Sequence, residues 1–158
     1  MTTDSIKIRP ATKGDGPAIL ELILGLARFE KAEDQVEIRA RDLELDGFER
    51  NPPAFFAYIA ECENEAIGFS LAFIRYSTWR GRMWYVEDLF VRESFRGQGV
   101  GKLLLKAQMD HALKEGIQQV CLQVLEWNEP AFRFYRQFGS VEDPEWVNIR
   151  IPLHELSF

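Results

Sequence analysis

The segment Arg96-Gly97-Gln98-Gly99-Val100-Gly101 constrains this chain more than any other feature, because it stands between a predicted strand and a predicted helix. The first N–H groups of a helix have no partners inside the helix. Glycines let a ligand approach these groups, the helix dipole adds partial positive charge, and Arg96 and Lys102 add full charges. The segment therefore predicts a phosphate-binding loop, with an ordinary glycine-rich turn as the alternative.

Two familiar nucleotide-binding motifs do not fit this loop. A P-loop needs GxxxxGK followed by Ser or Thr, whereas Lys102 is followed by Leu103. A Rossmann fingerprint follows the first strand of a βαβ unit, whereas this loop comes after four predicted strands. What remains is the pattern Arg-x-x-Gly-x-Gly after an apolar strand that carries two acids.

Hydrophobic periodicity predicts one continuous domain over residues 1–158 with the element order β-α-α-β-β-β-α-β-α-β. This order fits an α/β (α+β) fold of three layers on a mixed sheet. Strands are expected near Ile6–Ile8, Phe55–Ala60, Ala66–Ile74, Trp84–Val91, Val120–Val124 and Trp146–Pro152. Helices are expected near Asp15–Glu30, Arg39–Phe48, Gly99–Lys114 and Glu129–Phe138.

Charge and composition narrow the classes of partner. A formal net charge of -6 argues against a nucleic-acid-binding protein and suits a cationic small molecule. The N-terminus lacks the basic and apolar regions of a signal peptide, and no run reaches the length of a membrane span, so we expect a cytoplasmic protein that does not bind membranes. Neither Cys62 nor Cys121 has metal-ligand spacing, and we expect no metal.

The motifs taken together resemble the GNAT acetyltransferase superfamily, and within it the spermidine/spermine (diamine) and thialysine N-acetyltransferases. The similar segments include Phe29-Glu30, Tyr76-Ser77-Thr78-Trp79, Tyr85-Val86-Glu87-Asp88, Arg96 to Gly101, Glu126-Trp127-Asn128-Glu129-Pro130 and Phe134-Tyr135. The resemblance implies a GNAT-like three-layer α/β/α fold around a mixed, mostly antiparallel sheet, with acetyl-CoA as acetyl donor.

The resemblance also nominates the residues that hold acetyl-CoA. Backbone groups of a strand would bind the acetyl-pantetheine arm, the glycine-rich loop would bind the pyrophosphate, and the start of the last helix would contact the other side. These residues are Leu89, Phe90 and Val91; Arg96, Gly97, Gln98, Gly99, Val100, Gly101 and Lys102; and Asn128, Glu129, Pro130, Ala131 and Tyr135.

The acid pair Glu87 and Asp88 suits an amine acceptor. An aliphatic amine has a pKa near ~10.4, so the enzyme must bind a cation and then remove its proton. We predict Glu87 as the general base, directly or through a water, and Asp88 as a group that helps to hold the ammonium. Alternation along a strand predicts that the two side chains point to opposite faces. The alternative is one solvated acid and one that caps a neighbouring element.

Tyr135 lies among Phe132, Phe134 and Phe138, a setting in which a tyrosine often serves packing alone. The resemblance implies that its phenol protonates the departing thiolate. We therefore predict direct transfer in a ternary complex, without an acetyl-enzyme.

The acceptor is expected to be a small cationic amine, either a thialysine or lysine-like amino acid or a di- or polyamine. Ser77 resembles the thialysine branch more than the polyamine branch. The resemblance implies a homodimer and nominates Phe29, Glu30, Cys121, Leu122, Gln123, Glu145 and Trp146 for acceptor binding. A protein lysine or N-terminal acetyltransferase and a non-catalytic acyl-CoA-binding sensor remain alternatives.

Overall fold

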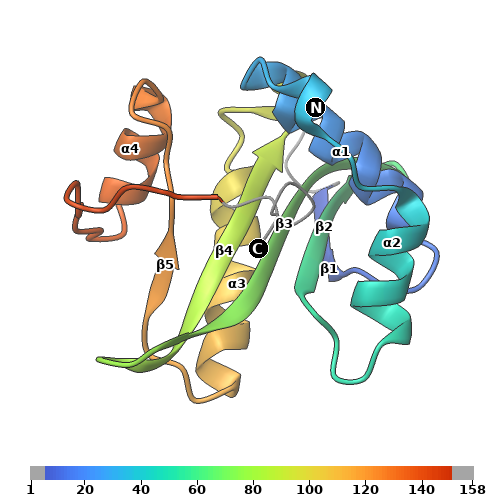
Figure 1. The fold of residues 1–158 in the computed structure, drawn as a ribbon. Coiled ribbons are helices and arrows are strands. Elements are labelled where there is room, and N and C mark those ends of the chain that lie inside the picture. The colour runs from blue at the N-terminus through green and yellow to red at the C-terminus, as the bar shows by residue number, and fades with distance from the viewer. Residues whose placement is uncertain (1–5, 151–158) are drawn as a thin grey trace, which may run out of the picture. The chain divides into compact units, whose positions relative to one another are not determined.

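The computed structural model describes residues 6–150 and divides the chain into two compact units, residues 1–123 and residues 124–158. The first unit contains β1 (Ile6–Pro10), α1 (Gly16–Phe29), α2 (Ala40–Glu44), β2 (Phe56–Cys62), β3 (Glu65–Ser77), β4 (Gly81–Val91), α3 (Val100–Lys114) and β5 (Val120–Leu122), as Figure 1 shows. The second unit contains α4 (Glu129–Arg136).

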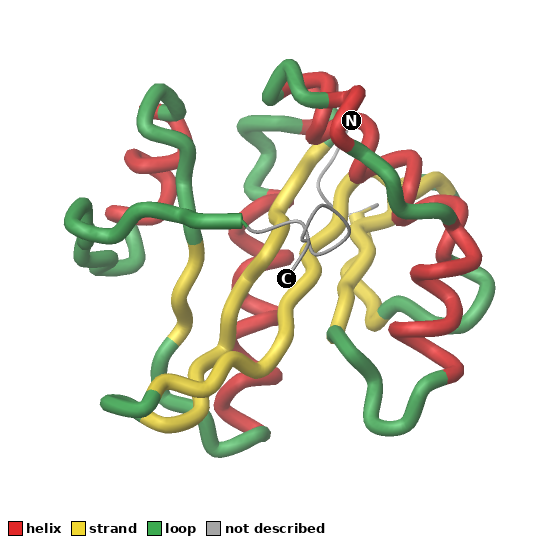
Figure 2. The backbone as a smooth tube through the Cα atoms, viewed as in Figure 1, coloured by secondary structure: helices red, strands yellow, loops and turns green. Residues whose placement is uncertain are grey.

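The sheet of the first unit has the strand order β1-β2-β3-β4-β5, and its strands run side by side in Figure 2. The first four strands pair antiparallel, and only β5 pairs parallel, with β4. This mixed, mostly antiparallel sheet confirms the predicted fold class. A parallel neighbour needs a crossover connection, which α3 supplies between β4 and β5.

Helices cover both faces of the sheet. On one face, apolar residues of α1 and α2, among them Ile19, Leu22 and Leu43, pack on β2, β3 and β4. On the other face, Val100 and Leu104 of α3 pack on β1, β2 and β3. The helical periodicity of these apolar residues explains why each helix buries one side, and the result is the predicted α/β/α layering.

A buried polar network ties α3 to the sheet. The Gln108 side chain, which is 0% exposed, donates from Nε2 to Ser70 Oγ at 3.0 Å and accepts from Trp84 Nε1 at 3.0 Å. The same amide nitrogen also donates to the Phe56 carbonyl at 3.4 Å. Gln108 thus satisfies polar groups of three strands at once.

Replacing Gln108 with leucine is expected to lower the free energy of unfolding by about 2–5 kcal/mol, because the Trp84 N–H and the Ser70 hydroxyl stay buried without their partner. Urea denaturation measures this loss. The exposed Gln118, changed to leucine in the same unit, serves as the control and should change stability little. A loss below about 1 kcal/mol for Gln108→Leu would show that the network relaxes around the change.

Two predicted elements differ in the structure. The helix expected over Arg39–Phe48 is a short α2 that continues as a wider π-helical turn over Leu45–Glu49. The strand expected over Trp146–Pro152 is wrong for residues 146–150, which are irregular, while residues 151 and 152 lie outside the described range. Alternating apolar residues form a strand only against a partner strand, and the described part of the second unit contains none.

Within residues 6–150, no helix combines the length and the apolar composition that crossing a membrane would require.

Candidate active site

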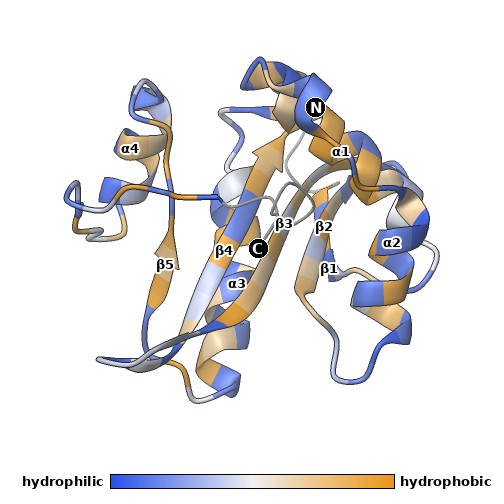
Figure 3. Cartoon of the chain, viewed as in Figure 1, coloured by the Kyte–Doolittle hydropathy of each residue, from blue (hydrophilic) through white to orange (hydrophobic). Residues whose placement is uncertain are grey.

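A β-bulge lies at the acid pair of β4. Leu71 of β3 pairs with Asp88, but the next residue, Ala72, pairs with Val86, so Glu87 has no partner on β3. Figure 3 shows the corresponding hydrophilic stretch in the middle of an otherwise largely apolar strand. Because Leu71 belongs to the core beneath α1, Asp88 shares the face that α1 covers. The extra residue of the bulge breaks the simple alternation on which the predicted opposite orientation of Glu87 rests, so that orientation stays a prediction.

Three neighbouring carboxylates form an acidic patch around Asp88, namely Glu30, Glu87 and Asp88 itself. Burial raises the pKa of Asp88 to about 7, and the charges of Glu87 and Glu30 add to the rise. Burial also raises the pKa of Glu30, the residue that follows α1. The patch combines a carboxyl group that titrates near neutral pH with a local field that attracts cations.

The edge of β4 that faces away from β3 is partly unpaired. β5 pairs with β4 only at Trp84, Tyr85 and Val86, immediately before the bulge. From Glu87 to Val91, no strand among the described residues occupies this edge. Unpaired strand edges bind extended ligands through backbone hydrogen bonds. The predicted pantetheine-binding residues Leu89, Phe90 and Val91 all belong to this stretch.

The glycine-rich loop leads into an uncapped helix. Gly97 has φ of +75° and Gly99 has φ of +82°, a left-handed conformation that glycine adopts without strain. Gly99 is the N-cap of α3 and supplies no side-chain acceptor. No acceptor among the described residues binds the N–H groups of Val100, Gly101 and Lys102. These donors, with the dipole of a 15-residue helix, fit the phosphates of a nucleotide cofactor.

Arg96 is held against two aromatic rings. Its guanidinium carbon lies 4.9 Å from the ring centroid of Phe29 and 5.6 Å from that of Phe90. Its Nε donates to the Val91 carbonyl at 2.9 Å. The predicted cofactor loop and Phe29, a predicted acceptor residue, are therefore in direct contact.

Changing Gly99 to valine is expected to raise the acetyl-CoA KM by about tenfold or more, because a β-branched residue in the left-handed region strains the backbone that presents the α3 N–H groups. Steady-state kinetics with varied acetyl-CoA measure this change. Gly116→Val is the matched control, since Gly116 has φ of +72° at the other end of α3. It should lower the melting temperature similarly but leave KM near wild type. An equal KM for both variants would contradict the loop assignment.

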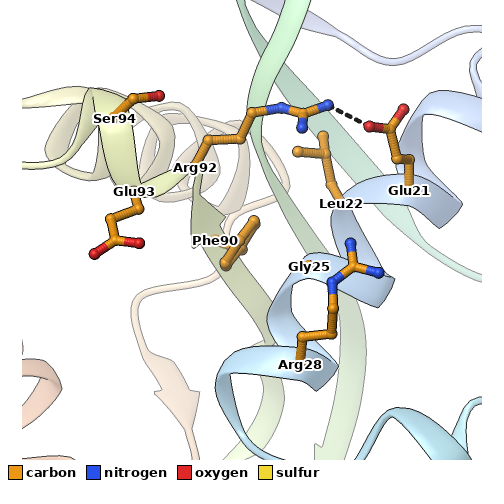
Figure 4. A pocket seen from close by; sticks show the side chains of 8 residues that line it. All are labelled: Glu21, Leu22, Gly25, Arg28, Phe90, Arg92, Glu93 and Ser94. Carbon is orange, nitrogen blue, oxygen red and sulfur yellow. Dashed lines mark hydrogen bonds and ion pairs between the residues drawn. The ribbon is translucent and has the colours of Figure 1, made fainter.

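A pocket of about 560 Å³ lies between α1 and the end of β4. Its residues, labelled in Figure 4, are Glu21, Leu22, Gly25, Arg28, Phe90, Arg92, Glu93 and Ser94. Arg92 forms an ion pair with Glu21 at 2.7 Å, and Arg28 pairs with Glu33 at 2.9 Å. Because both arginines have acidic partners, this pocket shows no clear preference for a charged ligand.

The second unit carries the remaining predicted cofactor residues. Asn128 is the N-cap of α4, and its side chain accepts from the Ala131 N–H at 3.3 Å. The Tyr135 ring lies on α4 in edge contact with Phe134, with ring centroids 5.0 Å apart. Asn128 therefore has a structural role in starting the helix, while the catalytic role of Tyr135 stays a prediction.

The residues predicted for acceptor binding fall into three groups. Phe29 and Glu30 end α1, and Glu30 belongs to the acidic patch. Cys121 and Leu122 lie on β5, where Cys121 pairs with Tyr85, and Gln123 follows that strand. The other two lie in the second unit, where Trp146 Nε1 donates to Asp143 Oδ2 at 3.1 Å and the Glu145 N–H donates to Asp143 Oδ1 at 3.4 Å.

The sequence prediction missed one charged residue beside Tyr85. The Arg75 guanidinium lies over the Tyr85 ring, 5.7 Å from its centroid. Arg75 lies one residue beyond the predicted strand Ala66–Ile74, and the pairing of the longer β3 with β4 brings it to Tyr85.

Comparison with known proteins agrees with this geometry. Residues 19–139, which span both units, match the family described as Acetyltransferase (GNAT) family. The chain is 40% identical over 157 residues to a thialysine N-epsilon-acetyltransferase of Sus scrofa, covering 92% of each chain. It is 33% identical to spermidine/spermine N(1)-acetyltransferase-like protein 1 of Homo sapiens, covering 97% of this chain and 23% of that one.

Solved structures support the same fold. The crystal structure of the aminoglycoside acetyltransferase meta-AAC0020, from an uncultured soil metagenomic sample, has a TM-score of 0.79 at 21% identity and covers 96% of this chain and 98% of its own. The chain thus has the fold and the sequence pattern of this family, and its glycine-rich loop leads directly into α3. The chain belongs to the GNAT family of acetyltransferases.

Proposed function

We propose that this protein transfers the acetyl group of acetyl-CoA to the primary amine of a small cationic acceptor, by direct attack in a ternary complex. The observation that carries the proposal is the acidic patch of Glu30, Glu87 and Asp88, which adjoins the unpaired edge of β4. An acceptor amine held at the patch would therefore lie beside the strand that binds the acetyl arm. The names of the thialysine and spermidine/spermine relatives support the same class of acceptor.

The acids bind the ammonium and accept its proton. The sequence assigned the second role to Glu87, and that assignment stays a prediction. Asp88 is the second candidate for the general base. Burial raises its pKa to about 7, and a base works best with a pKa near the working pH. A bound cation opposes the rise, so the carboxylate is ionised when the amine arrives.

The loop and α3 hold the cofactor. The N–H groups at the start of α3, together with Arg96 and Lys102, would bind the pyrophosphate. Acetyl-CoA supplies an acetyl group activated as a thioester. Backbone N–H groups near Leu89 would stabilise the oxyanion that forms on its carbonyl.

The transfer exchanges one bond of the acetyl carbon for another. The neutral amine nitrogen attacks the thioester carbonyl carbon, so that a C–N bond forms and the C–S bond breaks. The ammonium gives one proton to the acid pair before the attack. The Tyr135 hydroxyl gives its proton to the departing sulfur, and the second proton that leaves the nitrogen restores the phenol through solvent, so that the products are the amide, the CoA thiol and one proton on the acid pair, without an acetyl-enzyme.

Assembly and location belong to the same proposal. The resemblance to the thialysine and polyamine enzymes implies a homodimer, which light scattering of the purified protein would test. Action in the cytoplasm is part of the same proposal, and imaging of the tagged full chain would test it.

A turnover screen tests the proposal. Release of CoA from acetyl-CoA would be followed with thialysine, lysine, 1,5-diaminopentane, spermidine and a lysine-containing peptide. We expect at least one small amine to exceed the peptide in kcat/KM by about tenfold or more. A preference for the peptide would indicate a protein acetyltransferase. Binding of acetyl-CoA without turnover of any amine would indicate a sensor.

A further inference from the structure

Tyr85 lies between an aromatic ring and a cation on the face that carries the acidic patch. The Phe73 ring centroid is 5.1 Å from that of Tyr85, and the Arg75 guanidinium carbon is 5.7 Å from the same centroid. Phe73 packs against the core beneath α1, to which Leu71, the partner of Asp88, also belongs. Tyr85, Arg75 and Asp88 therefore share one face of the sheet.

The distance along this face is short. Tyr85 and Asp88 are three positions apart on β4, which corresponds to roughly 10 Å along an extended strand and less across a bulge. The Arg75 guanidinium carbon lies 5.7 Å from the Tyr85 ring centroid and Arg75 pairs with Met83, so its separation from Asp88 is roughly 10 to 15 Å. An extended lysine, with a hydrogen bond of about 2.9 Å at each end, spans the shorter part of this range.

Arg75 has the properties of a free anion-binding group. It is exposed, and it forms no ion pair with any residue in the range 6–150, although Arg9, Arg92 and Arg136 all do. Burial raises the pKa of the Tyr85 phenol, Glu87 adds to the rise, and Arg75 opposes it. The acidic patch and Arg75 thus act on the same phenol with opposite charges.

The acidic patch and the Arg75 guanidinium together favour a ligand that carries an ammonium group at one end and a carboxylate at the other. An amine terminus suits the acidic patch, and a carboxylate suits the guanidinium, which can bind it through two parallel hydrogen bonds. A diamine would instead place its second ammonium near Arg75 and be repelled. We propose that Arg75 binds the carboxylate of the acceptor, and so selects an amino acid with a terminal side-chain amine over di- and polyamines; this inference rests on the proposed function.

The test compares lysine with lysinamide, which keeps both amines and lacks the carboxylate. Wild type should prefer lysine over lysinamide in kcat/KM by about tenfold or more, the size expected for one exposed charge-assisted contact. Arg75→Gln should bring this ratio close to one, mainly by weakening the binding of lysine, and should let the diaminopentane bind more tightly. Arg75→Lys, which keeps the charge but loses the planar fork, should restore part of the preference.

Arg80→Gln is the matched control, because it removes one positive charge from the same β3–β4 hairpin and should keep the wild-type ratio. A wild-type ratio near one would overturn the inference, as would an Arg75→Gln defect of equal size for lysine and lysinamide. If wild type acetylates no amine, the proposed function fails. In that case, calorimetry of lysine binding in the presence of CoA tests whether Arg75 binds the carboxylate. Equal affinity of wild type and Arg75→Gln for lysine would refute this role.

Discussion

Asp88→Asn is expected to lower kcat/KM for the amine by about 10²-fold or more, because asparagine keeps the shape of the side chain but cannot accept a proton. In wild type, burial and the charges of Glu87 and Glu30 raise the pKa of Asp88 to about 7, so kcat/KM should fall as the pH drops below this value. The variant should lose this limb of the pH profile. Asp110→Asn, an exposed site on α3, serves as the control.

Glu87→Gln separates the two candidates for the base. If Asp88 accepts the proton, removing the negative charge of Glu87 lowers the pKa of Asp88. The low-pH limb of the kcat/KM profile then moves to lower pH, while kcat/KM on the high-pH plateau stays within a few-fold of wild type. If Glu87 accepts it, the plateau itself falls by about 10²-fold. A profile unchanged in both variants would remove the acid pair from proton transfer.

A stability measurement shows whether Asp88→Asn loses activity through misfolding. Asp88 has a pKa of about 7 in the folded protein and an ordinary pKa of 3.8 in the unfolded chain. Between these two pH values only the folded state keeps the proton, so the stability of wild type falls as the pH rises from 3.8 to about 7. The asparagine variant lacks this loss. It should therefore unfold at a higher temperature than wild type at pH 8, and the difference should shrink at pH 5. A variant that is less stable at both pH values would point to a packing defect.

Tyr135→Phe is expected to reduce kcat by about 10²-fold or more while the Kd for acetyl-CoA stays near wild type, because phenylalanine lacks the hydroxyl that supplies the proton to the departing sulfur. The ring and its edge contact with Phe134 remain. The defect should shrink at high pH, where the thiolate, with an ordinary pKa near ~8.5, needs no proton in order to leave.

Tyr76→Phe removes a phenol from the exposed end of β3 and should leave kcat close to wild type. A Tyr135→Phe enzyme with normal kcat would restrict Tyr135 to packing on α4. A raised Kd for acetyl-CoA with normal kcat at saturation would make it a binding residue instead.

Local features of the sequence were predicted best. The glycine-rich loop and the start of α3 beside Gly99 follow from neighbouring residue types. Helices such as α1 and α3 follow from apolar spacing along their own segments. The final strand was predicted wrongly because Trp146–Arg150 alternates like a strand but finds no partner strand in the described part of its unit.

Residue identity and short spacing were enough to establish the family, the glycine-rich loop and the presence of an acid pair in β4. The backbone geometry and the pKa of that pair depend instead on tertiary contacts. The bulge depends on the register between β3 and β4, the raised pKa of Asp88 depends on burial and on Glu30 from a distant helix, and the position of Arg75 over Tyr85 depends on strand pairing. Register, burial and charge proximity are properties of contacts between distant segments, and so no local pattern encodes them.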